Sequence, residues 1–129
     1  MKSEIEILEA EGYLLLTLCG DVSLASLKSC FYEVNEILRY NFHLKILIDG
    51  NGIEDFLMSN TVCQQIAPQL FNFPRRAAFF SKTPFVFGML RVFQASSFND
   101  NFRVFKSEEK ARRFLQPSRQ SEKVDDEGR

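Results

Sequence analysis

The fold is decided by residues 44–58, which read LKILIDGNGIEDFLM. The segment opens with a short apolar run that only Lys45 interrupts, and the run stops at Asp49. A strand that is apolar on both faces is typical of the middle of a sheet that is covered on both sides. We therefore expect a central strand over 44–48, followed by a glycine-containing loop over 49–55. In open α/β sheets, loops at the carboxyl ends of strands carry the sites.

The rest of the chain alternates between the two periodicities of strands and helices. The expected elements are strands at 4–8 and 13–19, a helix between Ser23 and Asn41, the strand at 44–48, a helix from about Ser59, a strand at 77–80, a helix at 85–95, a strand at 102–105 and a helix after Ser107. This β-β-α-β-α-β-α-β-α order predicts an α/β domain with a mostly parallel five-stranded sheet and an antiparallel edge strand, because strand–helix–strand crossovers join parallel strands.

Length and charge narrow the class of protein. The 129 residues carry a net charge of −1, which gives no electrostatic reason to expect nucleic acid or an anionic membrane as a partner. No apolar run approaches the roughly 20 residues that span a bilayer. Residues 1–116 should form one domain, and the polar segment 117–129 should be a disordered tail.

The three cysteines indicate the compartment. Cys19, Cys30 and Cys63 are odd in number, widely spaced and embedded in apolar runs. This pattern predicts buried free thiols in a reducing compartment instead of a disulfide framework or a zinc site. Because the first residues do not read as a signal peptide, we expect a cytoplasmic protein.

Four segments give the chain a resemblance to a known family. They are the apolar strand that closes at Gly20-Asp21, ILIDGNGI after the first helix, RRAAFFS at the fourth strand and RVFKSEEKARRFL at the end. With the order of elements, they make residues 4–115 similar to the SpoIIAA-like domains of the STAS superfamily, which includes anti-sigma-factor antagonists. The resemblance implies the SpoIIAA-like fold and a regulatory module that docks a protein partner.

The resemblance also points to the start of the second helix. In the antagonists, an Asp-Ser-Ser-Gly motif there carries a phosphorylated serine, and only Ser59 of that motif is present here. A phosphate at Ser59 would meet the free N–H groups of a helix start. An ordinary helix cap explains Ser59 as well, and we favour the cap. The candidate partner-binding loop comprises Asp49, Gly50, Asn51, Gly52 and Ser59.

Other chemistry in this loop has weaker support. Gly50-Asn51-Gly52 lacks the third glycine of a dinucleotide-binding loop and the lysine of a P-loop, so a turn with positive φ explains it better. The carboxylates of Asp49, Glu54 and Asp55 could hold a metal, but their spacing matches no EF-hand. We expect a solvated acidic loop, with no metal and no cofactor.

A catalytic triad is also disfavoured. His43 is the only histidine, and a strand separates it from Asp49 by roughly 20 Å. His43, Asp49 and Ser59 therefore cannot converge in the way that a nucleophile, its base and an orienting carboxylate must. We expect that the protein is not an enzyme.

The aromatic content of the second half is unusual, because the chain has 14 Phe and no Trp. The expected helix at 85–95 is apolar on nearly every side, and Arg91 is its only charge. Such a helix must be covered on more than one side. Three explanations stay open: packing against the last helix and the sheet, a homodimer interface, or a pocket for an apolar ligand. The candidate residues are Phe85, Phe87, Met89, Val92 and Phe93.

Two functions follow from these observations. The first is a non-enzymatic regulatory module that docks a protein partner, with a homodimer as one possibility. The second is a carrier or sensor of an apolar small molecule, which would use the Phe-rich half of the chain.

Overall fold

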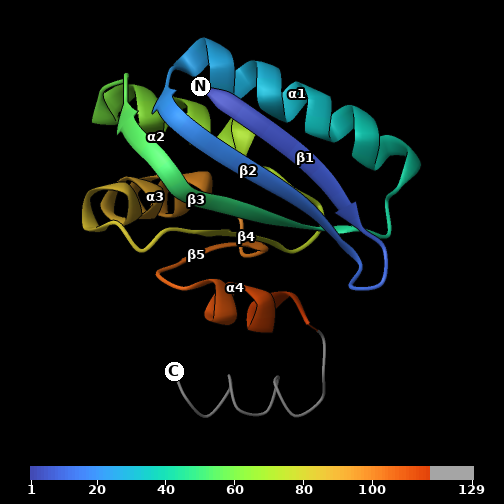
Figure 1. Cartoon of the computed structure of the whole chain (residues 1–129). Helices are drawn as coiled ribbons and strands as arrows, with labels where there is room; N and C mark the ends of the chain where they lie inside the picture. The colour runs from blue at the N-terminus through green and yellow to red at the C-terminus, as the bar shows by residue number, and fades with distance from the viewer. Residues whose placement is uncertain (117–129) are drawn as a thin grey trace.

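The computed structural model describes residues 1–116, and the expected disordered tail at 117–129 lies outside the described residues. Nine elements follow the predicted order (Figure 1). They are β1 (Lys2–Leu8), β2 (Tyr13–Val22), α1 (Leu24–Tyr40), β3 (Lys45–Phe56), α2 (Asn60–Leu70), β4 (Ala77–Phe80), α3 (Pro84–Ser97), β5 (Phe102–Phe105) and α4 (Glu108–Leu115).

One five-stranded sheet has the order β1-β2-β3-β4-β5. The β1–β2 hairpin is antiparallel, and the other three pairings are parallel. The predicted fold class is therefore confirmed. β3 lies in the middle of the sheet, and the side chains of Ile46, Leu47 and Ile48 are all fully buried. A strand with this burial on both faces requires a cover on each side.

The two covers are unequal. Side chains of α1, α2 and α3 share one core with Leu16 and Ile48 on one face of the sheet. On the other face, α4 alone packs against Leu47 and Phe80. Figure 1 shows α4 on the opposite side of the sheet from α1 and α2. Of the three explanations for the apolar helix, packing against the last helix and the sheet was right for the sheet and wrong for the last helix, because α3 packs against α2 and the sheet.

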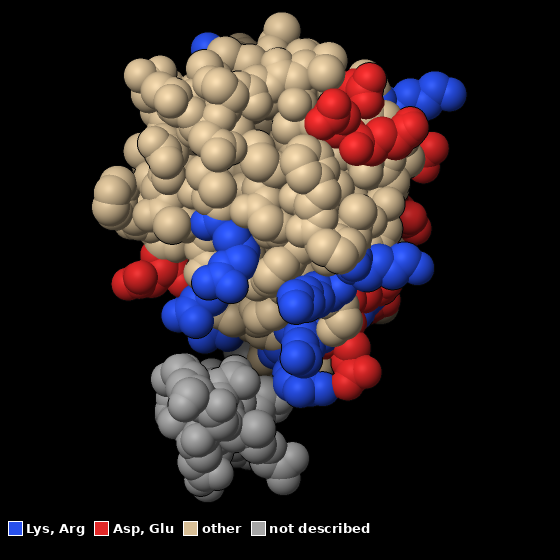
Figure 2. Space-filling model, turned by 90° about the vertical axis from the view of Figure 1, so that its left-hand side faces the viewer, with Lys and Arg blue, Asp and Glu red and all other residues tan. Residues whose placement is uncertain are grey.

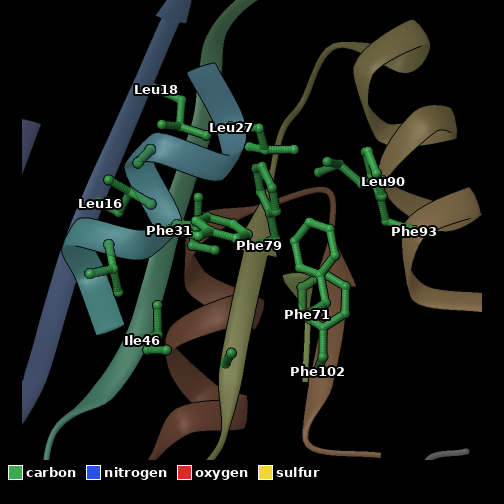
Figure 3. Close-up of a cluster of buried hydrophobic side chains, with 14 of the residues drawn as sticks. Leu16, Leu18, Leu27, Phe31, Ile46, Phe71, Phe79, Leu90, Phe93 and Phe102 are labelled. Atoms are coloured by element: carbon green, nitrogen blue, oxygen red, sulfur yellow. The ribbon is translucent and has the colours of Figure 1, made fainter. Parts of the chain in front are cut away.

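Phenylalanine rings fill the larger core. Phe71 is fully buried, and its ring centroid lies 4.5 Å from that of Phe102 and 4.9 Å from that of Phe93. The Phe31 ring meets the Phe71 ring edge-on at 5.2 Å. Figure 3 shows these rings gathered between the sheet and the helices. Offset and edge-to-face pairs of this kind stabilise a core beyond the area that they bury. The aromatic excess therefore serves internal packing first.

Polar contacts anchor α4 to the sheet. The Arg112 guanidinium forms salt bridges with Glu108 in its own helix and with Glu11 in the β1–β2 turn. Arg76 donates a hydrogen bond from Nη1 to the Phe114 carbonyl oxygen at 2.6 Å, and its guanidinium lies over the Phe114 ring. These contacts fix a short, strongly charged helix whose apolar side is narrow.

The helix starts follow the sequence closely. Ser23, Ser59 and Ser107 each cap a helix by accepting a backbone N–H three residues later. Pro68 lies inside α2, which ends two residues later at Leu70. Within residues 1–116, no helix is both long enough and apolar enough to cross a membrane.

Replacing Phe71 with alanine should lower the free energy of unfolding by about 3–5 kcal/mol, because a large cavity would open among packed rings. The matched control is Phe42→Ala, since the Phe42 side chain is 77% exposed and its loss should change stability by less than about 0.5 kcal/mol. Chemical denaturation followed by circular dichroism measures both values. Equal effects for the two variants would contradict the assigned core.

Candidate functional site

β3 is longer than the sequence predicts. Residues 49–55 were expected to form a loop, but the strand continues to Phe56. Beyond Asp49, β3 no longer pairs with β4, and its residues 52–56 pair with residues 19–22 of β2. These paired ends form a two-stranded arm that projects past the carboxyl end of β4 (Figure 1). The prediction of a loop was wrong because the partner strand β2 also extends past its expected end.

Close packing explains the two glycines in β3. A Cβ at Gly50 would lie 2.8 Å from Phe79 Cε1, and one at Gly52 would lie 2.7 Å from Cys19 Sγ. Neither glycine has a positive φ, so the predicted turn with positive φ was also wrong. Gly20, with a φ of 84°, takes the left-handed conformation in the neighbouring strand of the arm. A side chain at Gly50 or Gly52 would force the strands and the core apart.

Two polar side chains connect β3 to the turn before α3. The Asp49 Oδ1 atom accepts the Asn51 backbone N–H at 2.9 Å. The Asn51 Oδ1 atom in turn accepts the Lys82 backbone N–H at 2.8 Å. Asp49 and Asn51 therefore fix the backbone where β3 leaves β4.

Ser59 lies at the start of α2, where its Oγ accepts the Val62 N–H at 3.2 Å. The extended chain between Asp49 and Phe56 separates the two ends of the candidate partner-binding loop by roughly 20 Å. Asp49, Gly50, Asn51, Gly52 and Ser59 therefore lie on one end of the molecule, but they do not converge on a single point. This arrangement can present a surface, whereas chemistry on a bound group would need convergence.

The five apolar candidates on α3 divide into three groups. Phe85 is 54% exposed, at the first turn of the helix. Phe87, Met89 and Val92 are half-buried, and Lys106 Nζ lies 5.4 Å above the Phe87 ring. Phe93 is fully buried and packs against Phe71. Phe85 is thus the most accessible of them, and Phe93 belongs to the core.

Sequence reasoning missed Leu57. Its side chain is 58% exposed directly after the arm, and its backbone N–H donates to the Val22 carbonyl oxygen at 2.7 Å. The sequence did contain an indication of an apolar surface here, because no Asp or Glu occurs between Asp55 and Asp100. An exposed leucine at the start of so long a stretch without acidic residues could have been identified as part of a surface.

Figure 2 shows the end of the molecule that carries the arm, viewed from the left-hand side of Figure 1. One group of acidic side chains lies at the upper right, and most basic side chains lie in the lower half together with further acidic ones. A broad uncharged surface covers the upper left of this view. The exposed residues at this end include Leu57, Ser59 and Phe85. We call this surface the carboxyl-end face, because the parallel strands β2–β5 end there.

The free cysteines differ from the prediction in one case. Cys30 and Cys63 are buried as expected, but Cys19 is exposed. Cys19 points away from the core because the alternation of β2 places Leu16 and Leu18 inward. Burial raises the pKa of the Cys30 thiol to about 11, and it also raises the pKa of the Cys63 thiol.

Ionisable groups form few clusters. Among the described residues, no three His, Cys, Asp or Glu side chains come together in a way that could hold a metal ion. His43 Nε2 lies 3.6 Å from Glu9 Oε2, at the opposite end of β3 from the arm. The single imidazole is therefore remote from the carboxyl-end face.

Solved structures share this architecture. An uncharacterised DUF3478-family protein from Shewanella loihica PV-4 is 15% identical, with a TM-score of 0.55 over 89% of this chain and 93% of its own. The anti-sigma factor antagonist SpoIIAA in its unphosphorylated form is 13% identical, with a TM-score of 0.53 over 85% of this chain and 94% of its own. This is the SpoIIAA-like fold. No family model and no curated protein matches the sequence.

A further SpoIIAA-like structure is the phosphorylated form of the Bacillus cell fate determinant SpoIIAA. It is 16% identical, with a TM-score of 0.51 over 85% of this chain and 96% of its own. These identities are low, so the comparisons establish a shared fold. The sequence resemblance to SpoIIAA-like domains is confirmed at that level.

The two glycine environments predict opposite effects of alanine. Gly52→Ala should destabilise the SpoIIAA-like domain by about 1–3 kcal/mol, because the new methyl group would overlap Cys19 Sγ. Gly88→Ala, in the middle of α3, has free space around its Cβ and should stabilise the domain by about 1 kcal/mol through helix propensity. Thermal unfolding of both variants tests the pair, and a stabilising Gly52→Ala would contradict the close packing of the arm.

Alkylation should distinguish the three thiols. At pH 8, iodoacetamide should modify Cys19 quickly, while Cys30 and Cys63 should react only after unfolding because they are buried and protonated. Mass spectrometry of the native and urea-treated protein counts the modified sites, and Cys19→Ser should abolish the fast reaction. Rapid native modification of Cys30 would contradict its buried position.

Proposed function

We propose that this domain is a non-enzymatic regulatory module that docks a protein partner on its carboxyl-end face. The observation that carries the proposal is the pair of exposed apolar side chains, Leu57 directly after β3 and Phe85 at the start of α3. Figure 2 shows a broad uncharged area on this end of the molecule. An interface core is typically depleted of charge and enriched in aromatic residues.

The backbone at both residues is held in place before any partner binds. The Leu57 N–H donates a hydrogen bond to the Val22 carbonyl oxygen, directly after the arm. Phe85 follows Pro84, which occupies the start of α3 and sets its backbone. A backbone that is already ordered loses little conformational entropy on binding, so more of the energy of apolar burial contributes to affinity.

The arrangement of polar groups supports docking over catalysis. Ser59 accepts the Val62 N–H as a helix cap, and His43 lies at the other end of β3. A nucleophile and its base must lie within hydrogen-bond reach of each other, or of a shared substrate. The likeness in fold to an anti-sigma factor antagonist supports a regulatory role.

In this proposal Ser59 acts as a structural residue on the docking face. Its hydroxyl satisfies one of the free N–H groups at the start of α2. The exposed neighbours Asn60, Thr61 and Gln64 surround it with uncharged polar groups. Such groups form hydrogen bonds at the rim of an interface without the desolvation cost of a buried charge.

The double variant Leu57→Glu/Phe85→Glu should lose its partner, because burying each side chain contributes about 1.5–3 kcal/mol and a buried unpaired carboxylate opposes binding. We expect affinity to fall by more than about 100-fold. The measurement is affinity purification from the native cell with quantitative mass spectrometry, followed by binding of the purified partner.

Phe42→Glu is the matched control, since Phe42 is also an exposed phenylalanine but lies beside β3's amino end. It should retain every protein that the unmodified domain retains. Identical sets of retained proteins for both variants would contradict the proposed face. Light scattering on the purified domain tests the alternative that the same face joins two copies of the chain.

A further inference from the structure

The two edges of the sheet differ in how they are closed. At the β5 edge, the Val104 N–H donates to the Gln94 Oε1 atom at 2.8 Å, and the Phe102 N–H donates to the Asn99 carbonyl oxygen at 3.1 Å. The end of α3 and the turn that follows it therefore occupy the N–H groups of Phe102 and Val104, which β5 would otherwise offer to another strand. An edge closed in this way resists the addition of a further strand.

In the part of the chain that the structure describes, the β1 edge has no equivalent closure. β1 pairs with β2 along all seven of its residues, from Lys2 opposite Cys19 to Leu8 opposite Tyr13. A ladder uses the backbone groups on one side of a strand, so those on the other side of β1 face outward. Within residues 1–116, no hydrogen bond from a side chain or a loop reaches the backbone of residues 2–7 from that side. Figure 1 shows β1 as the outermost strand.

The side chains of β1 add a definite chemical pattern to this open edge. Glu4 and Glu6 lie opposite Thr17 and Leu15, on the face of the sheet that α4 leaves uncovered at this edge, and Lys2 begins the same row opposite Cys19. Both carboxylates are exposed, and in the described part of the chain neither has a basic side chain within ion-pair distance.

The other row of β1 side chains contains Ser3, Ile5 and Ile7. Ile5 packs against the core beneath α1, and Ile7 is 39% exposed. Over residues 4–7, an added strand would therefore meet carboxylates and aliphatic side chains at alternate positions.

This pattern disfavours full-length pairing with a second copy of the chain. In an antiparallel pair of β1 strands centred on Ile5, which would pair all seven residues, Glu4 of one copy would face Glu6 of the other on both sides of the axis. Like charges directly opposite each other destabilise a sheet. A shorter pair centred on Glu4 would place two Glu4 carboxylates face to face, with Lys2 opposite Glu6 on each side. Self-pairing is therefore limited to this shorter register.

We propose that β1 accepts an extended segment of a partner protein as a sixth strand of the sheet. The segment carries Lys or Arg at alternate positions, opposite Glu4 and Glu6, and β-branched residues such as Val or Thr between them, opposite Ile5 and Ile7. Backbone hydrogen bonds supply the affinity, and the alternating side chains supply the specificity. This surface is separate from the carboxyl-end face, so this inference stands or falls independently of the proposed function.

The probe is a labelled, acetylated and amidated peptide, KVKTKVKT, added to the full chain and followed by fluorescence anisotropy. We expect the peptide to bind and the acidic peptide EVETEVET not to bind. The variant Glu4→Lys/Glu6→Lys should weaken binding roughly tenfold, through lost pairing and new repulsion. The matched control, Glu33→Lys/Glu36→Lys, makes the same charge change on the exposed side of α1 and should leave binding within about twofold.

Backbone methylation of the peptide separates strand addition from simple charge attraction. N-methyl groups on alternate residues block one edge of an extended peptide and leave its charge unchanged. Two such peptides can be made, one methylated at the odd positions and one at the even positions, so that each has a different edge blocked. We expect the peptide whose blocked edge faces β1 to lose binding and the other peptide to retain it. Binding that survives both methylations, or that falls equally with the α1 control variant, would overturn the proposal.

Two further outcomes would also overturn it. The first is the absence of any binding by KVKTKVKT. The second is a dimer, seen by light scattering, whose outward β1 amides are already protected from hydrogen exchange, since that edge would then belong to a second copy. Circular dichroism of each variant confirms that the domain stays folded, which the exposed positions of Glu4 and Glu6 lead us to expect.

Discussion

The structure depends on the burial of β3 on both faces. Ile46, Leu47 and Ile48 have no contact with water, so helices must cover each side of the sheet. The larger cover of three helices requires an aromatic core, which the rings of Phe71 and Phe102 fill. The smaller cover is a single short helix, and a network around Arg112 holds it in place. The second half of the chain is rich in phenylalanine because its rings fill the larger core, under the three helices.

The same strand also determines the character of the carboxyl-end face. Because Gly50 and Gly52 allow close packing, β3 continues beside β2 past the end of β4 and forms an arm. The arm spreads the polar residues of this region along an extended chain and carries Leu57 to its end. A spread surface with a broad uncharged area is suited to contact with a protein, whereas a reactive cleft gathers its groups within a few ångströms.

Local patterns in the sequence predicted the elements well. The three-and-four spacing of α1, the serine caps at Ser23 and Ser59 and the apolar run of β3 each depend on neighbours close in the chain. The predictions that failed depend on distant partners. The extension of β3 required β2 beside it. The exposure of Cys19 depended on which face of β2 the helices cover, since Leu16 and Leu18 are the residues that point inward. The packing partners of α3 could not be predicted without knowing which face of the sheet α4 covers.

The sequence by itself determined the fold class, the order of the elements and most helix starts, because periodicity and capping act over a few residues. Only the tertiary structure decided which apolar residues stay exposed. Phe85 and Phe93 have the same chemistry and lie in the same helix, yet one faces water and the other packs against Phe71. That difference arises from the direction in which α3 packs on α2 and the sheet, and no local pattern contains it.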